Sequence, residues 1–147
     1  MTTIFSPDAL RVKTEKESQG RRTVIYSAKG QPNFMYQICR DDLPALHPAF
    51  CVNGQIIDAF FYAFYPGSLH DGELISQPEK APACHLNLPE FRQLAQQTGP
   101  GFHLSSNTEW AALMNCIDQQ NVIPDGNTDY GRSLRHPDQS AVRIDGK

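Results

Sequence analysis

Apolar and polar residues alternate in short segments of the N-terminal region, a pattern typical of β-strands. The alternation is weak over residues 9–16 and clearer over 21–28, where R-R-T-V-I-Y-S-A is rich in β-branched and aromatic residues. A third segment, N-F-M-Y-Q-I-C, covers residues 33–39. Turn residues separate the segments, first E-S-Q-G at 17–20 and then K-G-Q-P. We therefore predict a β-meander over residues 1–45, with a hairpin at its first turn.

A proline-containing linker follows the predicted meander. Two prolines in D-D-L-P-A-L-H-P (41–48) prevent a regular element and place a domain boundary near residue 45. Asn53 and Gly54 then predict a hairpin, because both favour the positive φ of a type I′ turn. The second arm is aromatic, and we interpret it as a core strand covered on both sides, the alternative being a ligand platform. Its aromatic residues are Phe60, Phe61, Tyr62, Phe64 and Tyr65.

A loop over 66–72, a short strand over 73–76 and an irregular segment over 77–82 lead to a predicted helix. Asn87 is its expected N-cap, because a glutamate three residues later completes a capping box. The glycine that follows Thr98 supplies the C-terminal stop. Apolar residues at i, i+3 and i+4 indicate the buried face of this helix, namely Phe91, Leu94 and Ala95.

A second helix is predicted after the stretch P-G-F-H-L-S-S-N-T-E-W. Ser106 and Glu109 have the S-x-x-E spacing of a capping box, so we interpret Glu109 as a capping partner rather than a general acid. His103 is expected to be a hydrogen-bonded structural histidine, and Asn121 to end the helix. We interpret Trp110 as a core residue rather than a ligand stacker. The expected apolar stripe consists of Trp110, Leu113, Met114 and Ile117, with Ala111 beside it.

The composition of the 147 residues is that of a globular protein, with 39% hydrophobic and 20% charged residues, and the predicted strands and helices make it an α+β domain. The net charge is -3 and no basic stripe is present, which argues against nucleic acid as a partner. The sequence has no apolar run long enough for a membrane helix, and its first residues lack the pattern of a signal peptide.

The four cysteines, Cys39, Cys51, Cys84 and Cys116, form no C-x-x-C motif. We interpret them as buried free thiols, because unpaired cysteine behaves as a small hydrophobic residue. A zinc site built from scattered ligands is the less favoured alternative. Whether Cys39 and Cys51 meet across neighbouring strands is left open by the sequence.

Asp125, Asn127 and Asp129 have the spacing that begins a calcium-binding loop. Tyr130 occupies the position where an EF-hand needs glycine, and His136 the position where it needs glutamate. An EF-hand is therefore excluded, and a looser calcium site is an alternative to a turn-rich surface loop. We expect no other cofactor. The sequence also lacks the G-x-S-x-G motif of a nucleophile elbow, so it shows no recognisable catalytic motif.

Three linked segments resemble one family. They are H-P-A-F-C-V-N-G (47–54), G-P-G-F-H-L-S-S-N-T-E-W-A-A-L (99–113) and P-D-G-N-T-D-Y-G-R-S (124–133). Together they resemble the sulfatase-modifying-factor-like, or formylglycine-generating-enzyme-like, branch of the C-type lectin fold found in tail proteins of phages and prophages. The resemblance implies a C-type-lectin-like fold over 46–147, with two helices on short antiparallel sheets after the N-terminal meander.

The family continues into a D-L-x-G-N-V-x-E-W segment and closing strands that do not occur in this sequence. We therefore expect the fold to be incomplete at its C-terminus. Reactive cysteines of the enzymatic members lie in that later part, so no catalytic role transfers to the cysteines present. The resemblance thus favours a protein that is not an enzyme.

The function implied by the resemblance is that of a virion component, a tail-fibre or host-attachment protein that presents a loop surface to a host glycan or surface protein. Its expected location is the phage tail, or the bacterial cytoplasm when a prophage is expressed. Expected partners are other tail proteins and further copies of the chain, since a short meander needs a surface to pack on. Neither nucleic acid nor membrane insertion is expected. The alternatives are a formylglycine-generating type of enzyme that acts on a protein cysteine, and a purely structural domain.

The predicted ligand-binding residues lie in and beside two loops, 66–72 and 125–136. Amide and carboxylate groups there suit sugar hydroxyls, and aromatic rings suit the face of a sugar. The candidate residues are Tyr65, His70, Asp71, Asp125, Asn127, Asp129, Tyr130, Arg132 and Arg135.

Overall fold

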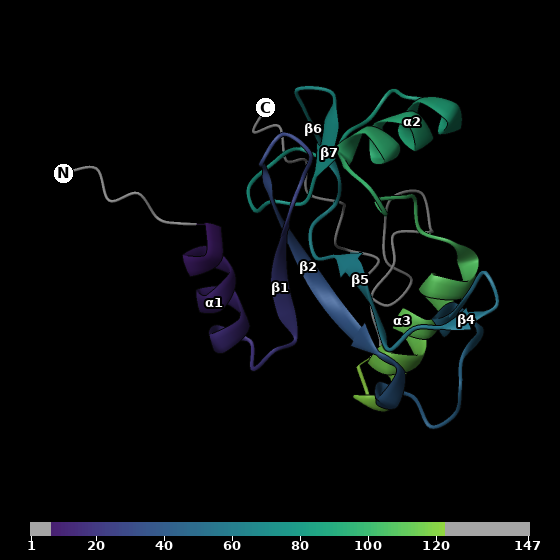
Figure 1. The fold of residues 1–147 in the computed structure, drawn as a ribbon. Helices are drawn as coiled ribbons and strands as arrows, with labels where there is room; N and C mark the ends of the chain where they lie inside the picture. Colours follow the sequence, from purple (N-terminus) through teal and green to yellow (C-terminus); the bar gives the residue numbers. More distant parts are fainter. Residues whose placement is uncertain (1–6, 123–147) are drawn as a thin grey trace, which may run out of the picture.

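The computed structural model describes residues 7–122, which form a mixed α+β arrangement with small antiparallel sheets (Figure 1). The predicted α+β class is therefore confirmed. Its helices are α1 (Pro7–Glu17), α2 (Leu88–Thr98) and α3 (Asn107–Gln119), with 3-10 turns at Arg40–Asp42 and Pro48–Phe50. Its strands are β1 (Arg22–Tyr26), β2 (Pro32–Cys39), β3 (Cys51–Val52), β4 (Gln55–Ile56), β5 (Ala59–Ala63), β6 (Ser68–His70) and β7 (Glu73–Ile75).

The first element is the helix α1, so the prediction of a strand over 9–16 and of a hairpin at 17–20 is wrong. Charged residues at helical spacing stabilise α1, with Arg11 Nη2 lying 3.3 Å from Asp8 Oδ1. The long side chains of Arg, Lys and Glu favour helix, and this preference outweighs the weak alternation. The Thr23 hydroxyl donates to Glu15 Oε1 at 2.7 Å, which ties α1 to β1.

β1, β2 and β5 form a three-stranded antiparallel sheet in that order (Figure 1). β2 precedes the predicted domain boundary near residue 45 and β5 follows it, so both predicted domains contribute strands to one sheet. Successive side chains of a strand point to opposite faces, and residues paired across an antiparallel ladder point to the same face. Ile38 and Phe60 are paired and share one face, whereas Met35 and Ala63 are paired and share the other.

The face that carries Ile38 and Phe60 packs on the hydrophobic core beneath α3. Phe50 is fully buried there, and its ring centroid lies 5.3 Å from that of Phe60. The core consists of Ile38, Leu43, Ala49, Phe50, Ala112 and Cys116, with the half-buried Tyr36, Ile57, Phe60, Tyr62 and Leu113 packed against it. It therefore joins β2, the linker, the second 3-10 turn and α3.

The buried positions of α3 differ from the predicted stripe. Ala112 and Cys116 are buried, whereas Trp110 is 52% exposed. The interpretation of Trp110 as a core residue is therefore wrong. The small side chains of α3 pack against the sheet. The indole of Trp110 lies at the edge of this contact, where its ring centroid is 6.5 Å from that of Tyr62. Leu113, another residue of the predicted stripe, is half-buried, so the stripe is confirmed only in part.

The hairpin predicted at Asn53 and Gly54 is confirmed, with φ of 49° and 77° at the two residues. Its arms are only β3 and β4, and the aromatic segment is a separate strand, β5, that pairs with β2. Phe61 is 42% exposed and Phe64 is 44% exposed. The interpretation of a strand covered on both sides is therefore wrong, because the neighbour that would cover the second face is not formed by residues 7–122.

β6 and β7 form a two-stranded hairpin beside α2. The prediction of a loop over 66–72 thus missed β6, whereas the short strand after it is confirmed as β7. The capping box of α2 is confirmed: Glu90 N donates to Asn87 Oδ1 at 3.0 Å, and Asn87 N donates to Glu90 Oε2 at 2.7 Å. Ala95 is buried on the predicted face of this helix.

Candidate functional site

Tyr65 is half-buried and serves packing rather than ligand display. Its ring stands edge-on to Phe34, with the centroids 6.2 Å apart, and edge-on to Phe64 at 5.0 Å. The Tyr65 N–H donates to Ser76 Oγ at 3.0 Å, which holds the residue against the start of the 77–82 segment. These contacts pack the residue that the sequence assigns to a sugar platform against its aromatic neighbours.

His70 and Asp71 are exposed at the turn between β6 and β7. The Asp71 carboxylate lies 3.3 Å from Lys29 Nζ, and Lys29 Nζ also donates to the Asp71 carbonyl oxygen. The turn is therefore held to the loop between β1 and β2. The remaining predicted ligand residues, including those of the possible calcium loop, lie outside the described residues, namely Asp125, Asn127, Asp129, Tyr130, Arg132 and Arg135.

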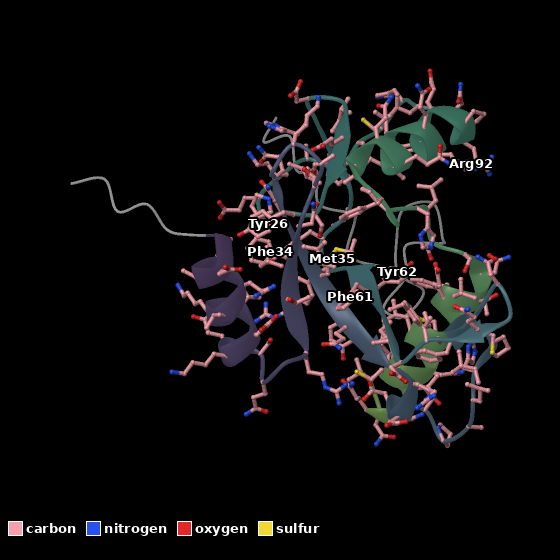
Figure 2. All side chains as sticks on the ribbon, viewed as in Figure 1. Tyr26, Phe34, Met35, Phe61, Tyr62 and Arg92 are labelled. Carbon is pink, nitrogen blue, oxygen red and sulfur yellow. The ribbon has the colours of Figure 1, made fainter. Side chains whose placement is uncertain are left out.

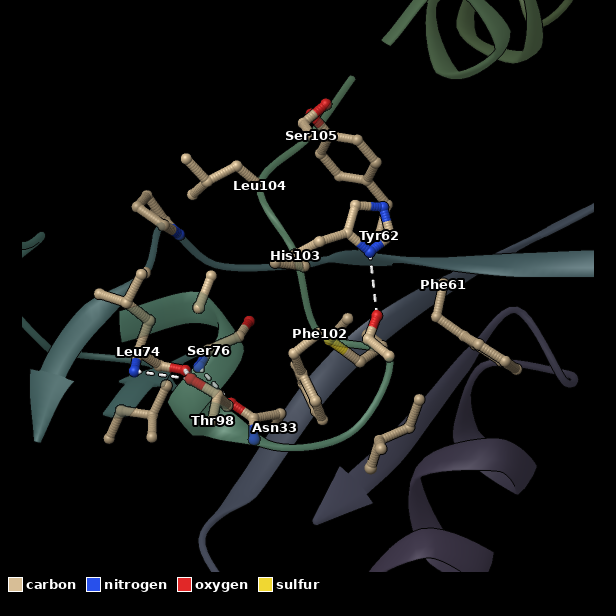
Figure 3. Close-up of a pocket in the computed structure, with 18 of the residues that line it drawn as sticks. Asn33, Phe61, Tyr62, Leu74, Ser76, Thr98, Phe102, His103, Leu104 and Ser105 are labelled. Atoms are coloured by element: carbon tan, nitrogen blue, oxygen red, sulfur yellow. Dashed lines mark hydrogen bonds between the residues drawn. The ribbon is translucent and has the colours of Figure 1, made fainter. Parts of the chain in front are cut away.

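A pocket of about 630 Å³ lies elsewhere, mainly on the sheet face of Met35 and Ala63, and Phe60 and Tyr62 of the core face also line it (Figure 3). Its walls come from all three strands of the main sheet, from β7 and α2, and from the segment 100–105 that leads to α3. A volume in this range is typical of small-molecule and side-chain binding sites. Neither Tyr65 nor the β6–β7 turn residues line it.

Most of the pocket wall is apolar. Figure 2 labels Met35 on β2 and Phe61 on β5, and both residues line the pocket. The apolar side chains of the wall are Ile25, Met35, Phe60, Phe61, Ala63, Pro66, Leu74, Ile75, Pro82, Ala83, Phe91, Ala95, Pro100, Phe102 and Leu104. Phe61 is an exposed ring at this wall. Covering such a ring with a ligand removes apolar surface from water, which favours binding.

The buried polar groups at the base of the pocket are bound to each other. Ser76 N donates to Asn33 Oδ1 at 2.7 Å, and Leu74 N donates to Thr98 Oγ1 at 2.9 Å. The Thr98 hydroxyl is also within 2.9 Å of the Leu94 carbonyl oxygen. These bonds join β2, β7 and α2 into one rigid base, so we assign them a structural role.

The segment 99–102 positions the loop wall of the pocket. Gly99 has a φ of 153° and a ψ of 172°, a conformation that is essentially restricted to glycine. A Cβ atom there would lie 3.3 Å from the ring of Phe102. Ala28 N donates to the Thr98 carbonyl at 2.7 Å, and Phe102 N donates to the Gly99 carbonyl at 3.1 Å. The end of α2 is thereby fixed to the loop between β1 and β2 while the chain turns toward the pocket.

His103 and Glu109 form the charged part of the pocket rim. His103 Nε2 lies 2.6 Å from Glu109 Oε1, and His103 Nδ1 lies 2.9 Å from the Gly101 carbonyl oxygen (Figure 3 shows the second bond). Both partners are acceptors, so the ring satisfies both only when it is protonated. The hydrogen bond to Glu109 and that to Gly101 raise the pKa of His103. The expectation of a hydrogen-bonded histidine is confirmed.

Glu109 also performs the predicted capping role. Ser106 N donates to Glu109 Oε2 at 2.9 Å, and Glu109 N donates to Ser106 Oγ at 3.2 Å. One carboxylate therefore caps α3 with one oxygen and binds the histidine of the loop wall with the other. Since both oxygens are engaged, this geometry favours a positioning role over proton transfer to a ligand.

Hydroxyl groups complete the rim beside β5. The Tyr62 hydroxyl donates to Ser105 Oγ at 2.7 Å, which connects β5 to the segment before α3. Ser105 is exposed at this rim, and its hydroxyl donates to the Ser106 carbonyl oxygen at 3.2 Å. The sequence signalled this region only indirectly, by the aromatic β5 and by the P-G-F-H-L stretch. Neither pattern indicated that the two segments face each other.

The cysteines are free and none of them lines the pocket. Cys116 is buried as expected, but Cys51 and Cys84 are exposed and Cys39 is half-buried, so the prediction of four buried thiols is wrong. Cys39 pairs with Ala59 rather than with Cys51. Burial raises the pKa of the Cys39 and Cys116 thiols, the direction opposite to that of an activated nucleophile.

Within residues 7–122, no group of three His, Cys, Asp or Glu side chains has a geometry that could hold a metal ion. None of the helices in this range is long and apolar enough to cross a membrane.

No model of a protein family matches the chain, and no curated protein matches it.

Proposed function

We propose that the chain is a recognition domain of a phage or prophage virion, and that the pocket beside β5 binds a ligand on the host surface. The observation that carries the binding role is the open apolar pocket with a polar rim of His103, Ser105 and Glu109. An apolar interior with a few placed polar groups is the usual composition of a ligand site.

The virion part of the proposal is supported by the resemblance of 47–54, 99–113 and 124–133 to tail proteins. In this proposal the α+β arrangement is the first part of a C-type-lectin-like fold, and the partners are other tail proteins and further copies of the chain. Binding rather than catalysis is favoured, because the carboxylate and histidine at the pocket are already engaged with each other and with the backbone.

Binding to host cells tests the proposal. Fluorescently labelled chain is applied to a panel of bacterial strains, and bound fluorescence is measured against concentration. The wild-type chain should bind at least one strain saturably. Ala63→Trp, which places an indole in the pocket on an edge strand that tolerates aromatic residues, should weaken binding by about tenfold or more.

The matched control is Leu69→Trp, which adds the same group to an exposed position of β6 that does not line the pocket. It should bind as the wild type does. Equal binding by Ala63→Trp and the wild type would remove the pocket from the recognition surface, and binding to no strain would remove the attachment role.

A further inference from the structure

The outer edge of β5 presents backbone groups that have no sheet partner. Phe64 N donates to the Phe34 carbonyl at 3.0 Å, and Arg40 N donates to the Asp58 carbonyl at 2.8 Å. Bonding direction alternates along an antiparallel strand, so the even-numbered residues of this segment bond to β2. The N–H and C=O groups of Ala59, Phe61 and Ala63 therefore point away from β2. Among the described residues, no hydrogen bond reaches these groups.

The sequence of this edge does nothing to block strand pairing. Natural edge strands are commonly protected by lysine, by proline or by a charged residue that points inward. β5 reads A-F-F-Y-A and contains none of these. The opposite edge of the sheet differs, because α1 packs against β1 there. β5 is thus the accessible edge of the main sheet in the described part of the chain.

The open edge adjoins the pocket. Phe61 and Ala63 line the pocket on one side, and the segment 100–105 lines it on the other. This segment runs from α2, on the pocket face, to α3, on the core face, and so passes the sheet on the β5 side (Figure 1). No backbone hydrogen bond joins the segment to β5 within residues 7–122, and the Tyr62 hydroxyl donates to Ser105 Oγ between them.

We propose that the ligand of this site is an extended polypeptide of a partner protein, which adds a strand to β5 and places an apolar side chain in the pocket. The inference rests on the proposed function in one respect, namely that the pocket is a binding site. Alternating N–H and C=O groups along β5 match the backbone of an extended peptide, and the apolar wall beside them provides side-chain selectivity. A sugar offers hydroxyl groups but no matching backbone repeat.

The position of 100–105 favours a single strand over a second copy of the chain. Two copies paired edge to edge through β5 would each bring their own 100–105 segment into the same gap. A lone peptide strand needs only the spacing of about 4.8 Å between neighbouring strands and brings no such segment.

The test uses peptides selected on the purified full chain from a displayed library of random heptapeptides. A selected peptide is synthesised, and its Kd is measured by fluorescence anisotropy. Two further versions are made, N-methylated at alternate amides in the two possible registers. Strand addition predicts that one register weakens binding by more than about tenfold, because its methyl groups point at β5, while the other register binds within about twofold.

A variant of the protein at position 63 tests the same geometry as the methylated peptides. Ala63→Pro removes an outward N–H without removing a bond to β2, and should weaken peptide binding about tenfold. Leu69→Trp, which changes an exposed position of β6 outside the pocket, is the control and should bind within about twofold. Near-UV circular dichroism checks that both variants are folded. If Ala63→Pro is unfolded, the methylated peptides still decide the test.

Each result that would contradict a proposal leads to a different conclusion. Equal binding of both methylated registers would overturn strand addition while leaving the pocket as a ligand site. Selection of no peptide, with host binding still sensitive to Ala63→Trp, would also overturn it and leave the proposed function intact. A homodimer in light scattering that Ala63→Pro converts to monomer would assign the edge to a second copy instead. Peptide binding without any host binding would retain the inference and overturn the attachment role.

Discussion

His103 connects two parts of the pocket wall through a single ring, whose protonated form both partners favour. Its two nitrogens meet the Gly101 carbonyl and the Glu109 carboxylate, at 2.9 and 2.6 Å. Loss of the proton removes one of the two donors, and the loop side or the helix side must then give up its bond. The histidine therefore makes the contact between the 100–105 segment and α3 dependent on pH.

The stabilising effect of His103 should decrease as pH rises. Its pKa in the folded chain is raised above the ordinary value of 6.5, so its contribution is complete below about pH 6.5 and is lost as pH passes the folded-state pKa. We expect the difference in unfolding free energy between wild type and His103→Gln to shrink between about pH 5.5 and 8.5. The change should stay under about 1 kcal/mol, because the ring is 60% exposed.

Urea unfolding of both proteins across this pH range measures the difference, and an NMR titration of the ring gives the pKa directly. A titration midpoint at or below 6.5 would contradict the assignment. A stability difference that grows with pH would do so as well.

At the scale of elements, α3 begins at Ser106 because its first turn is capped from both directions. The capping box supplies partners for backbone N–H groups that the helix itself leaves unpaired. The same glutamate binds His103, so the start of the helix and the rim of the pocket depend on one side chain. A substitution in the cap is thus expected to alter the position of Glu109 and, with it, the rim of the pocket.

Ser106→Ala should lower the free energy of unfolding by about 0.5–2 kcal/mol, because the Glu109 N–H loses its acceptor. Thr108→Ala is the matched control, two residues further along in the same exposed turn of α3. It should change stability by no more than about 0.5 kcal/mol. Denaturant unfolding followed by circular dichroism compares the two, and equal effects would show that the cap is not a stabilising feature.

Across the whole described molecule, the main sheet separates two functions. Its Ile38 and Phe60 face supports the core with α3, and its Met35 and Ala63 face supports the pocket. Both faces carry buried side chains, Ile38 on the first and Asn33 and Met35 on the second. The second face is available for a ligand because residues 7–122 leave Phe61 exposed on it.

Phe50→Ala should destabilise the fold by about 3–5 kcal/mol, because the ring is fully buried and its loss leaves a cavity. Phe61→Ala should cost less than about 1 kcal/mol, since its ring is 42% exposed at the pocket. Thermal unfolding of both variants checks this difference. A comparable loss from both would mean that the pocket face carries as much packing as the core.

Local signals predicted the features that depend on neighbouring residues. The capping boxes at Asn87 and Ser106 and the hairpin turn at Asn53 and Gly54 are formed as expected. Each is decided within a few residues by hydrogen bonds or by φ, so the tertiary context has little to change. The strand over 9–16 was predicted from weak alternation and is instead the helix α1.

The sequence by itself thus determined the α+β class, and it also determined the beginnings of α2 and α3 and the turn at Asn53 and Gly54, since these three features are local. Only the tertiary structure decided that β5 pairs with β2, that Phe61 is exposed, and that 100–105 faces β5 across a pocket. Those facts depend on which elements pack together from distant parts of the chain. The periodicity of a strand shows that it has two faces, but the neighbours alone decide which face is covered.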